Sequence, residues 1–186
     1  MDALIGKAKH LEASCYYKEA RDTLAILVVA YPKYSIPLVE IIKVYLAEQE
    51  WDDMLEAANR VLDNDSHNME AMKFKILYNL CRKGNYDEIS QNIQELYDEM
   101  NRSEPNNAIL YIQMAQLFSR LCGRNRLILE ETYMMASKAA QVDSSTAEYM
   151  TEVGYQCLMK GHTKEALKFY KKATKLDETS VAALTG

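Results

Sequence analysis

The residues with the greatest capacity for chemistry are three histidines and four cysteines. Histidine can act as a general base or a metal ligand, and a cysteine thiolate can act as a nucleophile or a zinc ligand. None of them forms a recognisable motif: no Cys-x-x-Cys pair, His-Glu-x-x-His, phosphate-binding loop or nucleophile elbow occurs. The residues are His10, His67, His162, Cys15, Cys81, Cys122 and Cys157. The sequence therefore predicts a non-enzyme with no catalytic residue, metal site or cofactor.

Charged clusters are the other candidates. The segment "EQEWDD" lacks the alternation and the glycine of a calcium-binding loop, so it predicts a turn followed by the start of a helix. Five lysines near the C-terminus follow helical spacing, opposite the small and apolar residues Ala166, Tyr170 and Ala173. They are Lys164, Lys168, Lys171, Lys172 and Lys175, here called the basic stripe. Such a stripe is either a solvated face or a contact for acidic lipid head groups or an acidic partner subunit.

Composition limits the remaining classes. The chain has 186 residues, 48% of them hydrophobic, which is enough to bury a core. Its net charge of −5 and the absence of nucleic-acid signatures argue against binding nucleic acid. The longest apolar run, "LAILVVAY", is too short to span a membrane, and the start of the chain does not resemble a signal peptide. A cytoplasmic, reducing location is expected, without disulfides.

The elements that must position these residues are helices. Glycine and proline are scarce, with 6 and 3 residues, and apolar residues recur three and four positions apart. Residues 147–180 predict two helices separated at "KGHT". One helix has an apolar face of Met150, Val153, Gly154 and Cys157, and the next has Ala166, Leu167, Tyr170 and Ala173. Ser145 and Glu148 have the spacing of a capping box for the first helix.

This helical hairpin recurs along the chain with a spacing of 34 residues or slightly more. Three copies have the basic length, residues 1–34, 35–68 and 147–180. Residues 69–107 form a divergent, lengthened third copy, and residues 108–146 form a fourth with "GRNRL" inserted in its turn. Residues 181–186, "VAALTG", look like the start of a truncated sixth copy, which leaves an open C-terminal end that could self-associate.

The pattern resembles the tetratricopeptide repeat, W-x2-L-G-x2-Y followed by A-x3-F and Pro. In the last copy these slots hold Met150, Val153, Gly154, Cys157, Ala166, Tyr170 and Glu178. The residue sizes match better than the identities, because small residues such as Gly154 let paired helices approach closely. The resemblance implies an all-α fold, a right-handed superhelical solenoid of antiparallel helical hairpins.

Longer blocks of sequence carry a narrower resemblance. They are "GKAKHLEASCYYKEARDTL", "KYSIPLVEIIKVYLAEQEWDDMLEAANRVL" and "ALKFYKKATKLDETSVAALTG". These blocks resemble the tetratricopeptide subunit of intraflagellar transport complex A. The resemblance implies a non-catalytic protein–protein interaction scaffold for retrograde transport in the cilium and at the ciliary base. Its implied partners are other protein subunits of that complex.

Tetratricopeptide arrays generally line their concave face with the first helix of each hairpin. The resemblance therefore implies ten partner-binding positions, here called the predicted groove residues. They are Ile5, Lys9, Val39, Lys43, Phe74, Tyr78, Ile112, Gln116, Thr151 and Tyr155, and the basic stripe would lie on the convex side. A partner helix or an extended peptide could lie in such a groove. Packing between neighbouring repeats is an equally strong interpretation of the apolar members.

A generic cytosolic peptide-binding adaptor or regulatory module is the alternative function. Chaperone-binding arrays hold a terminal carboxylate with Lys, Asn, Asn, Lys and Arg from three successive repeats. The first register here offers Ile5, Lys9, Glu40, Ala71 and Lys75, and no later register rebuilds the clamp. A co-chaperone role is therefore not expected.

Overall fold

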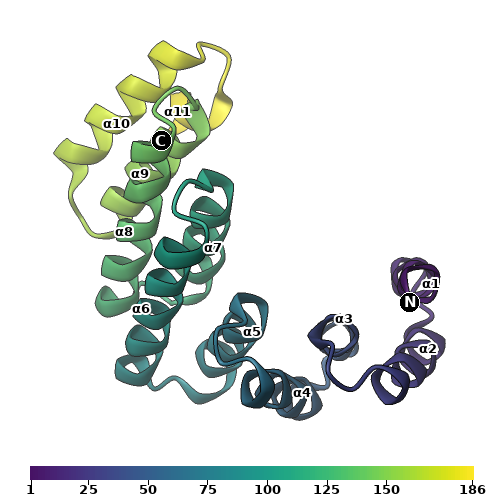
Figure 1. Cartoon of the computed structure of the whole chain (residues 1–186). Coiled ribbons are helices and arrows are strands. Elements are labelled where there is room, and N and C mark those ends of the chain that lie inside the picture. The colour runs from purple at the N-terminus through teal and green to yellow at the C-terminus, as the bar shows by residue number, and fades with distance from the viewer. The chain divides into compact units, whose positions relative to one another are not determined.

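A computed structural model, which describes residues 1–186, consists of helices and turns without any strand (Figure 1). Four pairs of consecutive helices pack through short turns into antiparallel hairpins, which agrees with the predicted all-α class. None of the helices is long and apolar enough to cross a membrane. The chain divides into two compact units, Met1–Tyr78 and Asn79–Gly186. Each unit has its own packed helices.

The N-terminal unit contains five helices, in which α1 pairs with α2 and α3 pairs with α4. Their bounds are α1 Asp2–Ala13, α2 Tyr17–Ala30, α3 Ser35–Glu48, α4 Trp51–Asn64 and α5 Met69–Tyr78. Small residues such as Ala8 and Ala20 are fully buried between the first two helices, beside Leu24 and Leu27. This arrangement follows from the sequence, because alanine lets two helix backbones approach while leucine fills the space around it. The segment "EQEWDD" forms the predicted turn and helix start, since α3 ends at Glu48 and α4 begins at Trp51.

The C-terminal unit pairs α7 with α8 and α9 with α10, and α8 also packs on α6 and α9. Its elements are a π-helical turn η1 Asn79–Lys83, α6 Tyr86–Ser103, α7 Ala108–Leu121, α8 Arg126–Val142, α9 Ala147–Met159, α10 Thr163–Leu176 and α11 Val181–Thr185. The core between these helices includes the fully buried rings of Tyr111 and Phe118.

The extra residues of the predicted third and fourth copies, residues 69–107 and 108–146, lie mainly in α6 and α8. Helix α6 has 18 residues and α8 has 17, whereas α2, α4 and α10 have 14 each. In "GRNRL", Gly123 and Arg124 turn the chain with φ of +56° and +65°, and Arg126 and Leu127 already belong to α8. Asn125 caps α8 by accepting from the backbone N–H of Leu127 and of Ile128. The boundary between the two units falls inside residues 69–107, where α5 passes into the π-helical turn.

Two local expectations are wrong. Ser145 does not form a capping box, because its hydroxyl and N–H both donate to Asp143 Oδ1, at 2.6 and 2.9 Å. Thr146 is the residue that precedes α9, and its hydroxyl also donates to Asp143. A carboxylate at the end of α8 therefore organises the turn in place of the residue beginning α9. Leu167 does not join the buried face of Ala166 and Tyr170, since 53% of it is exposed.

Candidate functional site

The predicted groove residues of α1 and α3 separate into buried apolar and accessible cationic members. Ile5 and Val39 are buried, whereas the ammonium groups of Lys9 and Lys43 lie nearer to solvent. Both ammonium groups meet one oxygen of the buried Glu40, at 3.3 Å from Lys9 Nζ and 3.1 Å from Lys43 Nζ. A buried carboxylate requires such partners, so Glu40 fixes where the two cations lie.

Two further features belong to the same unit. Partial burial, and next the nearby Glu40, raise the pKa of Glu12 above its ordinary value.

On α5, Phe74 is buried, and the hydroxyl of Tyr78 donates to Asp52 Oδ1 of α4 at 3.0 Å. Among the six predicted groove positions of this unit, the accessible polar groups are therefore the ammonium groups of Lys9 and Lys43 and the phenol of Tyr78.

Helices α7 and α9 carry the predicted groove residues of the C-terminal unit. Ile112 is buried, and Gln116 Nε2 donates to Glu148 Oε1 at 3.2 Å. The hydroxyl of Thr151 donates to the backbone carbonyl of Ala147 at 2.9 Å, so it is already satisfied within α9. The half-buried ring of Tyr155 lies under the Arg120 guanidinium, with 4.1 Å between the ring centroid and Cζ.

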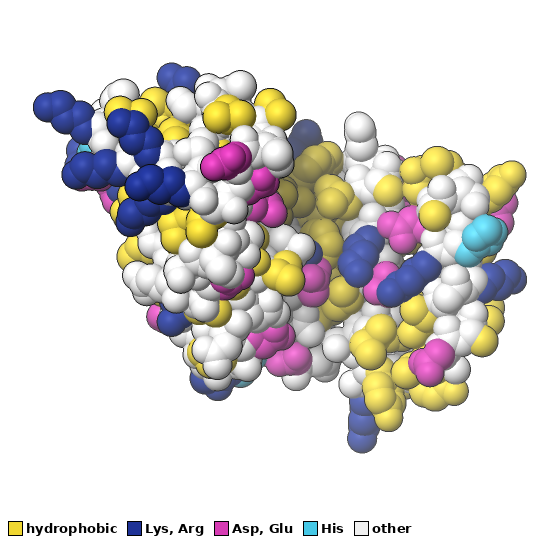
Figure 2. All heavy atoms as spheres, turned by 90° about the horizontal axis from the view of Figure 1, so that it is seen from above, with side chains coloured by type: hydrophobic (Ala, Val, Ile, Leu, Met, Phe, Trp, Pro, Cys, Tyr) yellow, Lys and Arg dark blue, Asp and Glu magenta, His cyan; other side chains and the backbone are white.

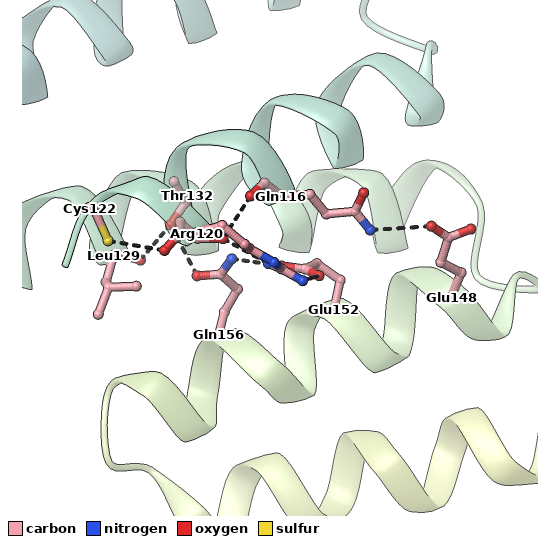
Figure 3. A network of polar contacts seen from close by, with 9 residues as sticks. Gln116, Arg120, Cys122, Leu129, Thr132, Glu148, Glu152 and Gln156 are labelled. Atoms are coloured by element: carbon pink, nitrogen blue, oxygen red, sulfur yellow. Dashed lines mark hydrogen bonds and ion pairs between the residues drawn. The ribbon is translucent and has the colours of Figure 1, made fainter. Parts of the chain in front are cut away.

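Arg120 belongs to a polar network that joins α7, α8 and α9 (Figure 3). Its two terminal nitrogens donate to the two carboxylate oxygens of buried Glu152, at 2.5 and 2.6 Å. Gln156 Nε2 donates to Glu152 Oε1 at 2.8 Å, and Thr132 Oγ1 donates to Gln156 Oε1 at 3.0 Å. Partial burial alone would lower the pKa of Arg120, but the hydrogen bonds that it donates to Glu152 hold its pKa above the ordinary value. The network fixes the register of three helices and the position of Tyr155.

Sequence reasoning missed the carboxylates and the arginine that position the accessible groove residues within each unit. Glu40 and Glu152 are buried charges, and a helical sequence pattern ordinarily assigns charges to the solvated face. A signal for the second network does exist, because Gln116 and Glu148 are 32 residues apart, and so are Arg120 and Glu152. Complementary side chains repeated at one spacing indicate contact between the first helices of successive hairpins.

The basic stripe lies on α10 with all five lysines exposed. Figure 2 shows the dark-blue side chains gathered at the left of the view, over α10. No lysine of the stripe pairs with a carboxylate, and Lys172 Nζ lies 5.4 Å from the centroid of the Phe169 ring. The opposite face of α10 packs against α9, where Tyr170 covers Gly154.

The cysteines and histidines do not converge. Cys15 and Cys81 are exposed, Cys122 and Cys157 are buried, and all four are free thiols. Partial desolvation of the Cys81 thiol and burial of Cys157 raise the pKa of both cysteines, which disfavours the reactive thiolate. No three side chains of His, Cys, Asp or Glu gather with the geometry of a metal site.

Comparison with known families and relatives gives consistent matches along the chain. Residues 91–186 match a family described as "Tetratricopeptide repeat protein 21 second ARM domain". Residues 1–55 match "Tetratricopeptide repeat protein 21 N-terminal ARM repeat". Over 184 residues the chain is 40% identical to tetratricopeptide repeat protein 21B of Homo sapiens and 38% identical to that of Mus musculus. These alignments cover 99% of this chain and 14% of each relative.

Solved structures of lower identity share the fold. MamA from Desulfovibrio magneticus RS-1 superposes with a TM-score of 0.67 at 15% identity, covering 97% of this chain and 96% of that one. YrrB, described as a TPR protein with an unusual peptide-binding site, superposes with a TM-score of 0.64 at 14% identity. That superposition covers 98% of this chain and 89% of YrrB. Both likenesses concern the arrangement of helices.

Proposed function

The chain belongs to the tetratricopeptide repeat protein 21 family, and from this premise we propose that it is a segment of a non-catalytic scaffold in the complex for retrograde intraflagellar transport. Its partners would be other protein subunits of that complex, in the cytoplasm, the cilium and the ciliary base. Because the chain spans 14% of the length of its relatives, the proposal concerns the contacts that this segment contributes.

The accessible predicted groove residues would make these contacts. Lys9 and Lys43 are held by Glu40, and Tyr155 is held by Arg120, so their positions are set before a partner arrives. Preorganised side chains lose less conformational entropy on binding than mobile ones. Ammonium groups and phenol rings suit a partner helix or extended peptide with acidic and apolar residues.

The single observation that carries the proposal is the 40% identity that extends over nearly the whole chain. The test is an affinity pull-down with the 186-residue chain from a lysate of ciliated cells, with mass spectrometry of the bound proteins. The groove variant combines Lys9→Ala with Tyr78→Ala. A matched control combines Lys18→Ala with Tyr16→Ala, which removes the same two side-chain types from exposed positions at the start of α2.

Circular dichroism should first show that both variants keep their helix content. We expect the parent chain and the control to enrich subunits of intraflagellar transport complex A, and the groove variant to lose them. Enrichment of unrelated cytosolic proteins by the parent chain would favour the alternative, a generic peptide-binding adaptor or regulatory module. Equal recovery of these subunits by both variants would show that the contact does not depend on Lys9 and Tyr78.

A further inference from the structure

A cavity of about 400 Å³ lies in the C-terminal unit, beside the turns that join α7 to α8 and α9 to α10. Its volume falls within the range of about 300–1,000 Å³ that is common for ligand pockets. Basic side chains dominate its polar lining, with Arg124 from the first turn, Arg126 from the start of α8, and Lys160 and His162 from the second turn. Glu130 is the single carboxylate among the lining residues.

The charges in this cavity do not balance. Lys160 Nζ lies 2.5 Å from Glu130 Oε2 and 4.3 Å from the centroid of the Tyr133 ring, and its side chain is only 10% exposed. Glu130 is therefore already compensated by a nearly buried ammonium group. Arg124 and Arg126 are exposed and form no ion pair, so two guanidinium charges remain without a carboxylate partner.

The site does not depend on the backbone at the start of α8. Asn125 Oδ1 already accepts from the N–H of Leu127 at 3.0 Å and from that of Ile128 at 3.4 Å. An incoming anion would instead meet side chains, and guanidinium groups can donate two parallel hydrogen bonds to a phosphate or carboxylate.

Positive charge continues from the cavity onto α10. His162 also lines a second hollow with Lys164, the first lysine of the basic stripe, and with Glu165, whose Oε2 lies 3.6 Å from His162 Nδ1. The dark-blue cluster over α10 in Figure 2 therefore begins beside the cavity. The whole chain has a net charge of −5, so this basic region is opposite in sign to the rest of the molecule. An acidic ligand would be steered toward it.

We propose that this cavity binds the phosphate group of a phosphorylated serine or threonine on a protein partner, with the basic stripe contacting acidic residues that flank it. The proposal rests on the protein-binding function proposed above and names the chemistry of one partner segment. Two uncompensated guanidinium groups match the charge of a phosphate monoester, about −1.5 to −2 at neutral pH, whereas one carboxylate would neutralise only half of them.

A recessed site favours a phosphorylated side chain over a membrane. Leu129 and Met159 contribute apolar wall to the cavity, between the two basic turns. A single side chain can enter such a recess, whereas the head groups of a bilayer form a broad surface that meets protruding residues first. The exposed lysines of α10 could contact either a protein partner or a membrane. The recessed arginines of the cavity favour the phosphorylated side chain of a protein.

Fluorescence anisotropy with the complete 186-residue chain tests the proposal. The probe is a fluorescein-labelled peptide with one phosphoserine among neutral residues, and its unphosphorylated form is the reference. The test variant combines Arg124→Asn with Arg126→Gln. Asparagine tolerates the positive φ at position 124, and glutamine is a good helix former at position 126. We expect the variant to bind the phosphopeptide about tenfold more weakly or worse.

A matched control replaces Lys18 and Lys33 with glutamine, which removes two exposed positive charges from the N-terminal unit. This control should keep the parent affinity. Unchanged affinity in the arginine variant, or an equal loss in the control, would overturn the site. So would arginine-dependent binding to phosphatidylserine-containing vesicles together with unaltered phosphopeptide binding, because the ligand would then be a membrane.

The failure of this site can be separated from failure of the proposed function. If the parent chain captures complex A subunits but binds the phosphopeptide and its reference equally, only the proposed phosphate site is refuted. If it binds the phosphopeptide through Arg124 and Arg126 but captures none of those subunits, the phosphate site is supported and the proposed role in intraflagellar transport is refuted.

Discussion

Replacing Gly154 with leucine should overpack the contact between α9 and α10. A Cβ atom at this position would lie 3.1 Å from Tyr170 Cε1 and 3.2 Å from both Cδ1 and Cζ. The Tyr170 ring is itself buried, at 6% exposure, so it has little room to move. An isobutyl group at position 154 would have to displace this ring, and we expect a loss of about 1–3 kcal/mol in the free energy of unfolding.

Alanine at the same position provides a graded comparison. It gains about 0.8–1 kcal/mol of helix propensity relative to glycine. Against this gain, its Cβ requires the ring to shift by a few tenths of an ångström. The two effects oppose each other, so Gly154→Ala should change the free energy of unfolding by less than about 1 kcal/mol. The series glycine, alanine and leucine at position 154 therefore separates the effect of helix propensity on stability from the effect of overpacking.

Urea unfolding followed by far-UV circular dichroism measures these differences through the transition midpoint at constant slope. Repeating both substitutions in a Tyr170→Ala background completes a double-mutant cycle. The leucine variant should lose most of its penalty there, because the truncated residue leaves space for the new side chain. An unchanged midpoint for Gly154→Leu, or the same penalty with and without the Tyr170 ring, would refute the reasoning.

Three further perturbations have defined outcomes. Glu152→Gln should cost about 1–3 kcal/mol in thermal unfolding, because Arg120 would lose its charged partner; an unchanged melting temperature would show that the network is energetically neutral. Hydrogen bonds from the residues after α8 hold the pKa of Asp143 below its ordinary value, so the unfolded chain takes up this proton first as pH falls below about 4. The stabilisation is present above that pH and is lost toward acid, and Asp143→Asn should flatten the acid limb of stability against pH. Val181 and Leu184 are 71% and 63% exposed, and replacing both with glutamate should abolish any concentration-dependent self-association seen by light scattering; persistence would locate it elsewhere.

The helical hairpins follow closely from sequence periodicity, whereas details at their ends do not. Apolar residues three and four positions apart predicted the buried face of Ala166, Tyr170 and Ala173, which the structure confirms. The same period included Leu167, which lies at the margin of that face, where a small rotation of the helix leaves it in solvent. The spacing of Ser145 and Glu148 indicated a capping box. In the structure the Ser145 hydroxyl instead donates a hydrogen bond to the preceding Asp143.

The predicted groove residues show a similar division. The resemblance assigned ten positions to the first helices, and four of the apolar ones, Ile5, Val39, Phe74 and Ile112, are buried between helices. Their partner-binding role stays a prediction. The accessible neighbours depend on Glu40, which no period in the sequence distinguishes from an ordinary surface charge, and on Arg120, whose sequence signal is its 32-residue spacing from Glu152.

By itself the sequence determined the helical class, the hairpin pattern and the position of small residues such as Gly154 that allow close packing, because these depend on local propensity and short-range spacing. Only the tertiary structure decided which carboxylates became buried and paired, such as Glu40 with Lys9 and Lys43, and which cations remained uncompensated, such as Arg124 and Arg126. Residues far apart in sequence must first be brought within a few ångströms before their charges can compensate each other, and that distance is a property of helix packing.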